Sequence, residues 1–314
     1  MKDVLRPYKT LDSSRICLGY ATPYASAKFI RARDPAFLPP VPQGNTAGPN
    51  NSGAISWIFP SNTAQYAVRP LGMDEVQACI FDVFGTLVDW RTAIIKALES
   101  EGKRCGASPQ TDWEAFANEW RQGYMRKTRE IANGLVDGPL NVDVLHRNIL
   151  EEMLASSKWN GLGKIWGDED RKKLTLAWHF LDGWADSSEG LHALKQTKII
   201  AALSNGNVRL LVDMAKHANL PWDAVLSCEL LGSFKPNPKT YLGAAYHLSL
   251  PPSQVAMVAA HIYDLRAAAS HGMKTVYVRR GEDIVDEVKS KADGGEVDVV
   301  VNSITELAAL INRV

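Results

Sequence analysis

The sequence predicts an α/β protein with a doubly wound (Rossmann-like) parallel sheet as its core and an inserted all-helical cap domain. Three observations lead to this fold. From residue 197 to the C-terminus, short apolar segments alternate with helical ones, which is typical of a parallel sheet with helices on both faces. One more apolar segment of strand length, 76–83, comes earlier. Between them, every periodic segment of the block 91–185 is helical.

Residues 1–72 do not have the composition of a core. They hold nine of the sixteen prolines, eight basic residues, three acidic residues and no glutamate, and we expect them to be mostly disordered. A faintly transit-like composition is one interpretation. We favour a dispensable extension, with Met73 as a natural beginning, because the amphipathic pattern of a transit helix is weak. The predicted domains are the extension 1–72, a core of 73–90 and 191–314, and a cap of 91–190.

The core segments follow from their residue patterns in chain order. The segment 76–83 is a short apolar run of strand length, with an acid, Asp82, near its end. Each later apolar run is bounded by polar, glycine or proline residues and followed by a helical pattern. The expected strands are 76–83, 197–206, 224–232, 254–261, 274–280 and 297–303. The expected core helices are 208–218, 238–249, 263–272 and 304–314.

The cap segments have apolar residues at helical spacing. In the longest, 108–134, aromatic residues recur at steps of three or four, and Gly134 ends the pattern. We expect Trp113, Trp120, Trp178 and Trp184 to pack in the cap core. The expected cap helices are 91–106, 108–134, 143–157 and 168–184.

Composition excludes several classes of partner. The 35 basic and 35 acidic residues give a formal net charge of zero, whereas nucleic-acid binding needs a basic face. No apolar run approaches the roughly 20 residues that cross a bilayer. The four cysteines are scattered without a CxxC pair, so neither a zinc site nor a disulfide framework is indicated. We expect a reducing compartment, the cytoplasm, or the mitochondrion if 1–72 is a transit segment.

Polar residues lie at or just after the ends of four of the predicted strands, and the fold brings these strand ends together. They are Asp82, the pair Ser204 and Asn205, Lys235, and the segment 261–264. A carboxylate in a Gly-Thr turn is well placed as a nucleophile. A hydroxyl group and a cation suit an anionic substrate. The sequence therefore predicts a small-molecule anionic substrate at this edge.

Four segments then resemble a known family. The strings FDVFGTLVD, LSNG, FKPNPKTY and VAAHIYDLRAA look, in order and spacing, like the four motifs of the haloacid dehalogenase superfamily. The resemblance extends from about residue 76 to the C-terminus and leaves the first seventy-odd residues unexplained. It implies the fold described above and a catalytic aspartate, matched by Asp82.

Position 84 separates the branches of that superfamily. Its phosphatases have a second aspartate there as general acid, whereas Phe84 cannot move a proton. They also bind Mg²⁺ through an acidic pair in the fourth motif, of which only Asp264 remains, and Mg²⁺ needs several oxygen ligands. The branch with an aromatic residue at this position and no metal is the type II (S)-2-haloacid dehalogenases. The resemblance therefore implies no metal and no cofactor.

Further roles follow from the same resemblance. Asp82 is matched to the nucleophile and Thr86 to the threonine of its loop. As a hypothesis, His261, Asp264 and Lys235 position the hydrolytic water.

A second set is expected to bind substrate and halide. Arg121, Asn205 and Tyr263 would cradle the departing halide. Ser204 and Lys235 would hold the substrate carboxylate and nearby charge. The full set of expected binding residues is Phe84, Arg121, Ser204, Asn205, Tyr241 and Tyr263.

Competing interpretations remain for single residues. Arg121 on its own reads as a solvated helix arginine, and its place in EWRQ favours the site. Tyr241 lies on an expected helix, so core packing competes with a site role. His261 is either a satisfied hydrogen-bonding residue or a group that activates water. The best-known members have serine and asparagine where this chain has Ala259 and His261, which bears on the hydrolytic step.

The expected activity is conversion of a 2-haloalkanoic acid to a 2-hydroxy acid and halide through an ester on Asp82. Two alternatives stay open. One is a metal-dependent phosphatase or another small-molecule hydrolase on the same fold. The other is a non-catalytic scaffold, against which the convergent charges argue. Family members are commonly dimers, so the resemblance allows a homodimer.

Overall fold

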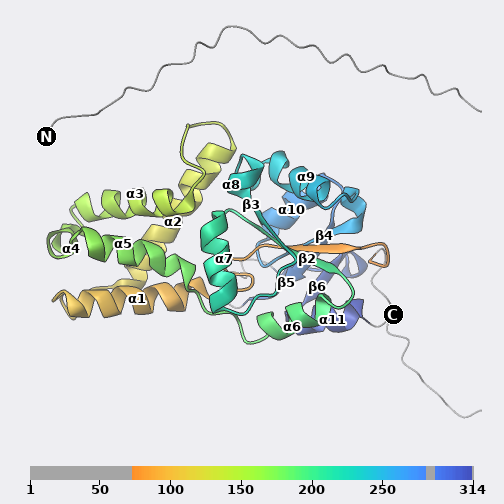
Figure 1. Ribbon diagram of the computed structural model, residues 1–314, viewed down its shortest axis with the longest axis horizontal. Coiled ribbons are helices and arrows are strands. Elements are labelled where there is room, and N and C mark those ends of the chain that lie inside the picture. The colour runs from red at the N-terminus through yellow and green to blue at the C-terminus, as the bar shows by residue number, and fades with distance from the viewer. Residues whose placement is uncertain (1–72, 281–286, 313–314) are drawn as a thin grey trace, which may run out of the picture. The chain divides into compact units, whose positions relative to one another are not determined.

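The computed structural model describes residues 73–280 and 287–312, and the predictions for 1–72 lie outside them. Its centre is a six-stranded sheet with the order β3-β2-β1-β4-β5-β6 (Figure 1). Every strand pair is parallel, which confirms the doubly wound prediction. The strands are β1 (Ala78–Phe81), β2 (Ile199–Ser204), β3 (Ala224–Ser227), β4 (Val255–Ala259), β5 (Lys274–Val278) and β6 (Val299–Val301).

Strand β1 lies between β2 and β4. Ile80 is in register with Ala201 on one side and with Met257 on the other. All four residues of β1 are buried, as expected of a strand with both neighbours in a covered parallel sheet. The segments that follow β1, β2 and β4 therefore leave the sheet at the same edge.

One predicted strand is shorter than expected. The segment 224–232 is a strand only to Ser227, whose Oγ accepts a hydrogen bond from the Glu229 N–H. This cap begins a short helix, α8 (Cys228–Leu231), which ends at Gly232 with φ of 74°. The apolar composition of residues 228–231 (CELL) is compatible with a strand or a helix. The serine cap favours the helix.

The remaining core helices cover the sheet. They begin with α6 (Ser187–Leu194), which was not predicted and which contacts the C-terminal helix. Gly190 permits this approach, because a Cβ there would lie 2.6 Å from Ile304. The predicted boundary at residue 190 falls inside α6, and the division into domains stays a prediction. The others are α7 (Val208–His217), α9 (Pro238–His247), α10 (Ile262–Ser270) and α11 (Ile304–Ile311), with 3₁₀ turns η2 (Pro252–Gln254) and η3 (Lys291–Asp293).

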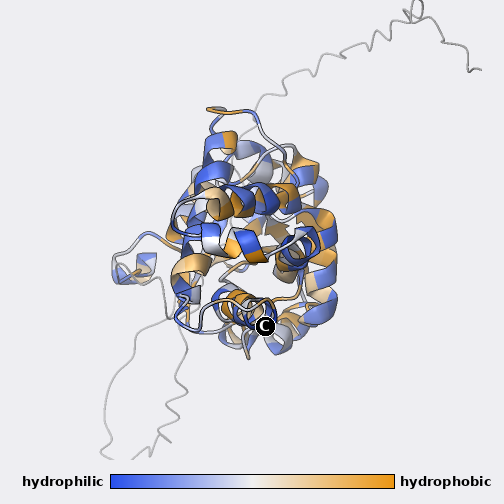
Figure 2. Cartoon of the chain, turned by 90° about the vertical axis from the view of Figure 1, so that its left-hand side faces the viewer, coloured by the Kyte–Doolittle hydropathy of each residue, from blue (hydrophilic) through white to orange (hydrophobic). Residues whose placement is uncertain are grey.

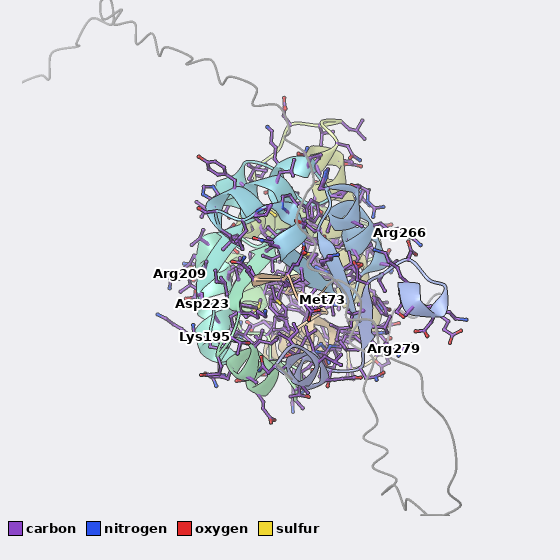
Figure 3. The ribbon with its side chains drawn as sticks, turned by 90° about the vertical axis from the view of Figure 1, so that its right-hand side faces the viewer. Met73, Lys195, Arg209, Asp223, Arg266 and Arg279 are labelled. Carbon is purple, nitrogen blue, oxygen red and sulfur yellow. The ribbon has the colours of Figure 1, made fainter. Side chains whose placement is uncertain are left out.

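Helix α6 is also tied to the sheet by charge. Lys195, at its C-terminal end, pairs with Asp223, and the two atoms Nζ and Oδ1 are 2.7 Å apart (Figure 3). The other oxygen of Asp223 accepts a hydrogen bond from the Ile200 N–H in β2. This contact fixes the segment that enters β3.

Helices α1 to α5 gather on one side of the sheet, at the left of Figure 1. Figure 2, viewed from that side, shows hydrophilic and hydrophobic residues on the same helices, as expected of amphipathic segments. They are α1 (Trp90–Arg104), α2 (Trp113–Ala132), α3 (Val142–Ala155), α4 (Asn160–Ile165) and α5 (Asp168–Leu176), followed by η1 (Ala177–His179). No strand occurs in 91–185, all of which is described, as predicted.

Helix α2 has the limits that its sequence indicates. Asp112 accepts a hydrogen bond from the Ala115 N–H at 2.9 Å, and Gly134 follows the C-cap with φ of 68°, a conformation that glycine adopts without strain. Its buried face includes Trp120. Gly123 lies on the same helix, where a Cβ would be 2.6 Å from Ile149 of α3. This glycine lets the two helices approach closely.

Two cap predictions were incomplete. The helix expected over 168–184 ends at Leu176, because Trp178 and His179 turn inward in η1 and are buried. Helix α4 was missed, since its two glycines weaken the helical pattern. One of them, Gly163, packs where a Cβ would lie 2.6 Å from the carbonyl oxygen of Leu154.

The two connections between sheet and cap run side by side. The Asp89 N–H donates to the carbonyl of Asp182 at 2.9 Å. Ser187 Oγ donates to the carbonyl of Leu87 at 2.7 Å. No helix among the described residues is long and apolar enough to cross a membrane.

Candidate active site

Asp82 is the first residue after the central strand β1. Its N–H donates to the carbonyl of Val258 in β4 at 3.0 Å. The side chain is held at both oxygens: Lys235 Nζ is 2.9 Å from Oδ1, and Thr86 Oγ1 donates to Oδ2 at 2.8 Å. Thr86 in turn accepts from the Ala260 N–H at 2.9 Å. The β1 loop and the end of β4 therefore orient the carboxylate together.

Lys235 joins two carboxylates. Besides Asp82, its Nζ lies 2.5 Å from Oδ2 of Asp264. All three side chains are buried. Tyr241 completes this cluster, because its hydroxyl donates to Oδ1 of Asp264 at 2.5 Å.

The charges of this cluster decide the ionisation state of Asp82. Burial raises the pKa of Asp82, but Lys235 and His261 outweigh it and hold the pKa well below its usual range. Burial raises the pKa of Asp264, and the charge of Asp82 adds to this effect against the pull of Lys235. Burial acts to lower the pKa of Lys235, but the two carboxylates raise it. Asp82 is therefore ionised near neutral pH.

His261 contacts Asp82 directly. Its Nδ1 lies 2.9 Å from Oδ2 of Asp82. The ring packs on Gly85, where a Cβ would be 3.3 Å from the imidazole. Gly85 has φ of 81°, so it supplies both the turn and the space for the histidine. The imidazole is in place to exchange a proton at this carboxylate.

The end of β2 contributes Ser204 and Asn205. Ser204 is buried, and its Oγ accepts from the Gly206 N–H at 3.2 Å, which leaves the hydroxyl proton available to an anion. Asn205 Oδ1 accepts from the Lys235 N–H at 2.8 Å. Asn205 thus holds the lysine loop in position.

Arg121 reaches the site from α2 of the cap. Its guanidinium lies over three aromatic rings, 5.6 Å from the centroid of Phe84, 5.4 Å from that of Trp90 and 4.9 Å from that of Tyr124. Its Nη1 is buried without a hydrogen-bond partner in the described part of the chain. A buried donor without a partner is costly, so this nitrogen indicates a place for an anion.

These groups line one cavity between sheet and cap. Eight of the eleven predicted site residues are on its wall, and sequence reasoning missed four cap residues and Pro236. The wall consists of Asp82, Phe84, Arg121, Tyr124, Met125, Thr128, Arg129, Ser204, Asn205, Lys235, Pro236, His261 and Tyr263. The missed cap residues follow Arg121 at helical spacing on α2, and this periodicity could have identified them.

Three predicted residues lie behind the wall. Thr86 and Asp264 support Asp82 and Lys235 from below. Tyr241 was predicted to bind substrate, but it is fully buried and bonded to Asp264. The structure favours the competing interpretation, core packing, because the helix α9 carries Tyr241 under the site and directs its hydroxyl at Asp264. The four tryptophans expected in the cap core are absent from the wall.

A ring stack supports the arginine from the cap interior. His146 stacks on Tyr124 with 5.0 Å between centroids and on Trp178 with 4.2 Å. Burial lowers the pKa of His146 well below its ordinary value, and Arg121 adds to this effect. Burial also raises the pKa of Tyr124 to about 12, against the opposing charge of Arg121. The arginine thus rests on neutral rings.

The donor set does not fit a magnesium ion. The site carboxylates are Asp82 and Asp264, and the ammonium group of Lys235 lies between them. Its positive charge occupies the space between the oxygens that a cation would need. The residues at this edge therefore favour metal-independent chemistry.

Comparisons with known proteins identify the family of the chain. The family model of haloacid dehalogenase-like hydrolases matches residues 76–272. The (S)-2-haloacid dehalogenase 4A of Burkholderia cepacia is 29% identical over 217 residues, covering 66% of this chain and 85% of that protein. The (S)-2-haloacid dehalogenase 1 of Pseudomonas sp. (strain CBS-3) is 30% identical, covering 66% and 86%.

Similar solved structures are also 2-haloacid dehalogenases. The L-2-haloacid dehalogenase PA0810 is 36% identical with a TM-score of 0.65, covering 74% of this chain and 97% of that one. The defluorinating L-2-haloacid dehalogenase Rha0230 is 37% identical with a TM-score of 0.68, covering 75% and 95%. With the family model matching more than half of its residues, the chain belongs to the haloacid dehalogenase-like hydrolases.

Proposed function

We propose that this protein is a 2-haloacid dehalogenase that converts a 2-haloalkanoic acid to a 2-hydroxy acid and halide through an ester on Asp82. One observation carries the proposal. The ionised carboxylate of Asp82 shares a cavity with Arg121, whose buried Nη1 has no hydrogen-bond partner within the described residues. A nucleophile and an acceptor for a departing anion are what displacement of a halide requires. The two relatives described above are (S)-2-haloacid dehalogenases, which supports the same class of reaction.

In the first step, an oxygen of Asp82 attacks C2 of the substrate. The carbon–halogen bond breaks, and its electron pair leaves with the halide toward Arg121. A halide leaves without a proton, so this step does not require a general acid at the position of Phe84. Ser204 has its hydroxyl proton available for the substrate carboxylate. The product of this step is an Asp82 ester and a halide ion.

In the second step, water attacks the carbonyl carbon of the ester. Either oxygen that remains as the carbonyl keeps a donor, Lys235 at Oδ1 or Thr86 at Oδ2, which stabilises the developing negative charge. His261 accepts a proton from the water. The bond between the Asp82 carbonyl carbon and the ester oxygen breaks, and that oxygen takes a proton. The turnover consumes one water and releases 2-hydroxy acid, halide and one proton.

The test is halide release from (S)- and (R)-2-chloropropionate with EDTA present, for wild type and Asp82→Asn. We expect release from the (S) enantiomer that the variant loses. In water labelled with heavy oxygen, a single turnover with excess enzyme should place the label on Asp82. Label only in the product would exclude the ester. Cleavage of phosphate esters on addition of Mg²⁺, with no halide release, would favour the phosphatase branch.

Three other expectations stay predictions. They are the cytoplasm as compartment, the homodimer and the absence of nucleic-acid binding.

A further inference from the structure

Arg129 is a second cap arginine on the wall of the same cavity. It follows Arg121 on α2 by about two helical turns, and Met125 and Thr128 line the wall between them. Its side chain is exposed, and its guanidinium lies 5.8 Å from the centroid of the Tyr263 ring. Arg129 therefore stands at the mouth of the cavity, with Tyr263 beside it.

The charges of the cavity set Arg129 apart. Lys235 is neutralised by two carboxylates. Arg121 faces inward with its buried Nη1 and, in the proposed function, receives the halide. Arg129 has no carboxylate partner among residues 73–280 and 287–312, and its contact there is the Tyr263 ring. A substrate with one carboxylate uses the inner groups and leaves this cation without a counterion.

We propose that Arg129 and Tyr263 form an outer anion subsite, and that the preferred substrates are 2-haloacids with a second acidic group at the far end of the chain. The second carboxylate would pair with the guanidinium of Arg129, whose planar fork matches a carboxylate. Met125 and Thr128 would contact the methylene groups between the two acids. This inference rests on the proposed function and adds the substrate class.

The test compares binding of product-like anions, which does not depend on turnover. Titration calorimetry measures the affinity of (R)-lactate and of (R)-2-hydroxyglutarate for wild type, Arg129→Gln and Arg126→Gln. Arg126 is an exposed arginine of the same helix that is not on the cavity wall, so it controls for the loss of one charge. We expect wild type to bind the diacid at least about tenfold more tightly than lactate. Arg129→Gln should lose most of this preference, and Arg126→Gln should keep it.

Other results overturn the proposal. Wild type without a preference for the diacid excludes the subsite. If Arg129→Gln loses the same factor of affinity for both anions, Arg129 acts only through general electrostatic attraction. If Arg129→Gln and Arg126→Gln lose the same part of the preference for the diacid, the cause is the change in net charge. The ratio of kcat/KM for 2-chloroglutarate and 2-chlorobutyrate should follow the binding preference. Absence of halide release from either, with the preference in binding intact, would refute the dehalogenase function and leave the subsite standing.

Discussion

Nδ1 of His261 lies 2.9 Å from Oδ2 of Asp82, although 179 positions separate the two residues in the chain. The contact joins an imidazole, which can accept or donate a proton, to the carboxylate that forms the ester in the proposed reaction. Gly85 leaves the space for the ring. A histidine at this position thus has a defined partner, and its role can be measured.

His261→Ala should slow breakdown of the Asp82 ester more than its formation. The physical reason is that the imidazole takes a proton from water in the second step, whereas halide departure needs none. We expect a drop of about 10²- to 10⁴-fold in the breakdown rate, the usual range for a general base. Rapid-quench single turnovers, with the ester detected by mass spectrometry, measure both rates.

The control for His261 is His247→Ala, an exposed histidine on α9 outside the cavity wall. It should leave both rates unchanged. Equal slowing of formation and breakdown in His261→Ala would contradict a role in the water step.

Arg121→Lys should lower halide release by about 100-fold or more, although it keeps the positive charge. Lysine lacks the planar guanidinium that lies over Phe84, Trp90 and Tyr124. A lost transition-state donor of this kind costs about 10²- to 10³-fold in kcat. Initial rates and inhibition by chloride, bromide and iodide measure the effect. Unchanged inhibition constants for all three halides would show that Arg121 does not receive the anion.

His179 should make the stability of the protein depend on pH. It bridges cap and core, with Nε2 3.0 Å from Asp143 of α3 and Nδ1 2.9 Å from Asp213 of α7. Burial acts to lower its pKa, but the two carboxylates raise it above 6.5. Asp213 also pairs with Arg209, whose positive charge moderates the pull of Asp213 on the histidine.

The sign of the effect follows from the raised pKa. The stabilisation is fully present below about pH 6.5, the unfolded value, and is lost as pH rises through the higher folded value. His179→Gln should therefore cost about 2 kcal/mol of unfolding free energy in mild acid and less in mild alkali. Urea unfolding across this pH range gives the measurement. His217→Gln is the control, because its partner Asp182 is largely exposed and such pairs contribute little. A cost that does not vary with pH would refute the ion-pair account.

Two glycines of α4 should respond oppositely to alanine. A Cβ at Gly163 would lie 2.6 Å from the carbonyl oxygen of Leu154, whereas nothing lies within 4 Å of one at Gly161. Gly163→Ala should destabilise the protein by about 1–3 kcal/mol through overpacking. Gly161→Ala should be neutral or stabilising by up to about 1 kcal/mol through helix propensity. Midpoints of urea unfolding compare the two, and equal effects would show that α4 does not pack this closely.

Local patterns were sufficient for much of the fold. The strand before Asp82, the alternation after residue 197 and the end of α2 at Gly134 depend on near neighbours in sequence. The predictions failed for segments whose local pattern is compatible with two structures. The segment 228–231 is a helix rather than a strand because Ser227 caps it. Helix α4 was not predicted because its two glycines weaken the helical pattern. For the site, parallel strands end at one edge by topology, so Asp82, Ser204 and Lys235 were found without coordinates.

The sequence by itself determined Asp82 as the candidate nucleophile, the aromatic residue at position 84 and the strand ends that surround them, because motif and topology need no side-chain coordinates. Only the tertiary structure decided that His261 reaches Asp82, that Tyr241 turns under the site to Asp264, and which face of α2 closes the cavity. These facts depend on how the cap docks on the sheet and on which rotamers the packed interior allows. No short stretch of sequence contains that information, because each contact joins residues that lie far apart in the chain.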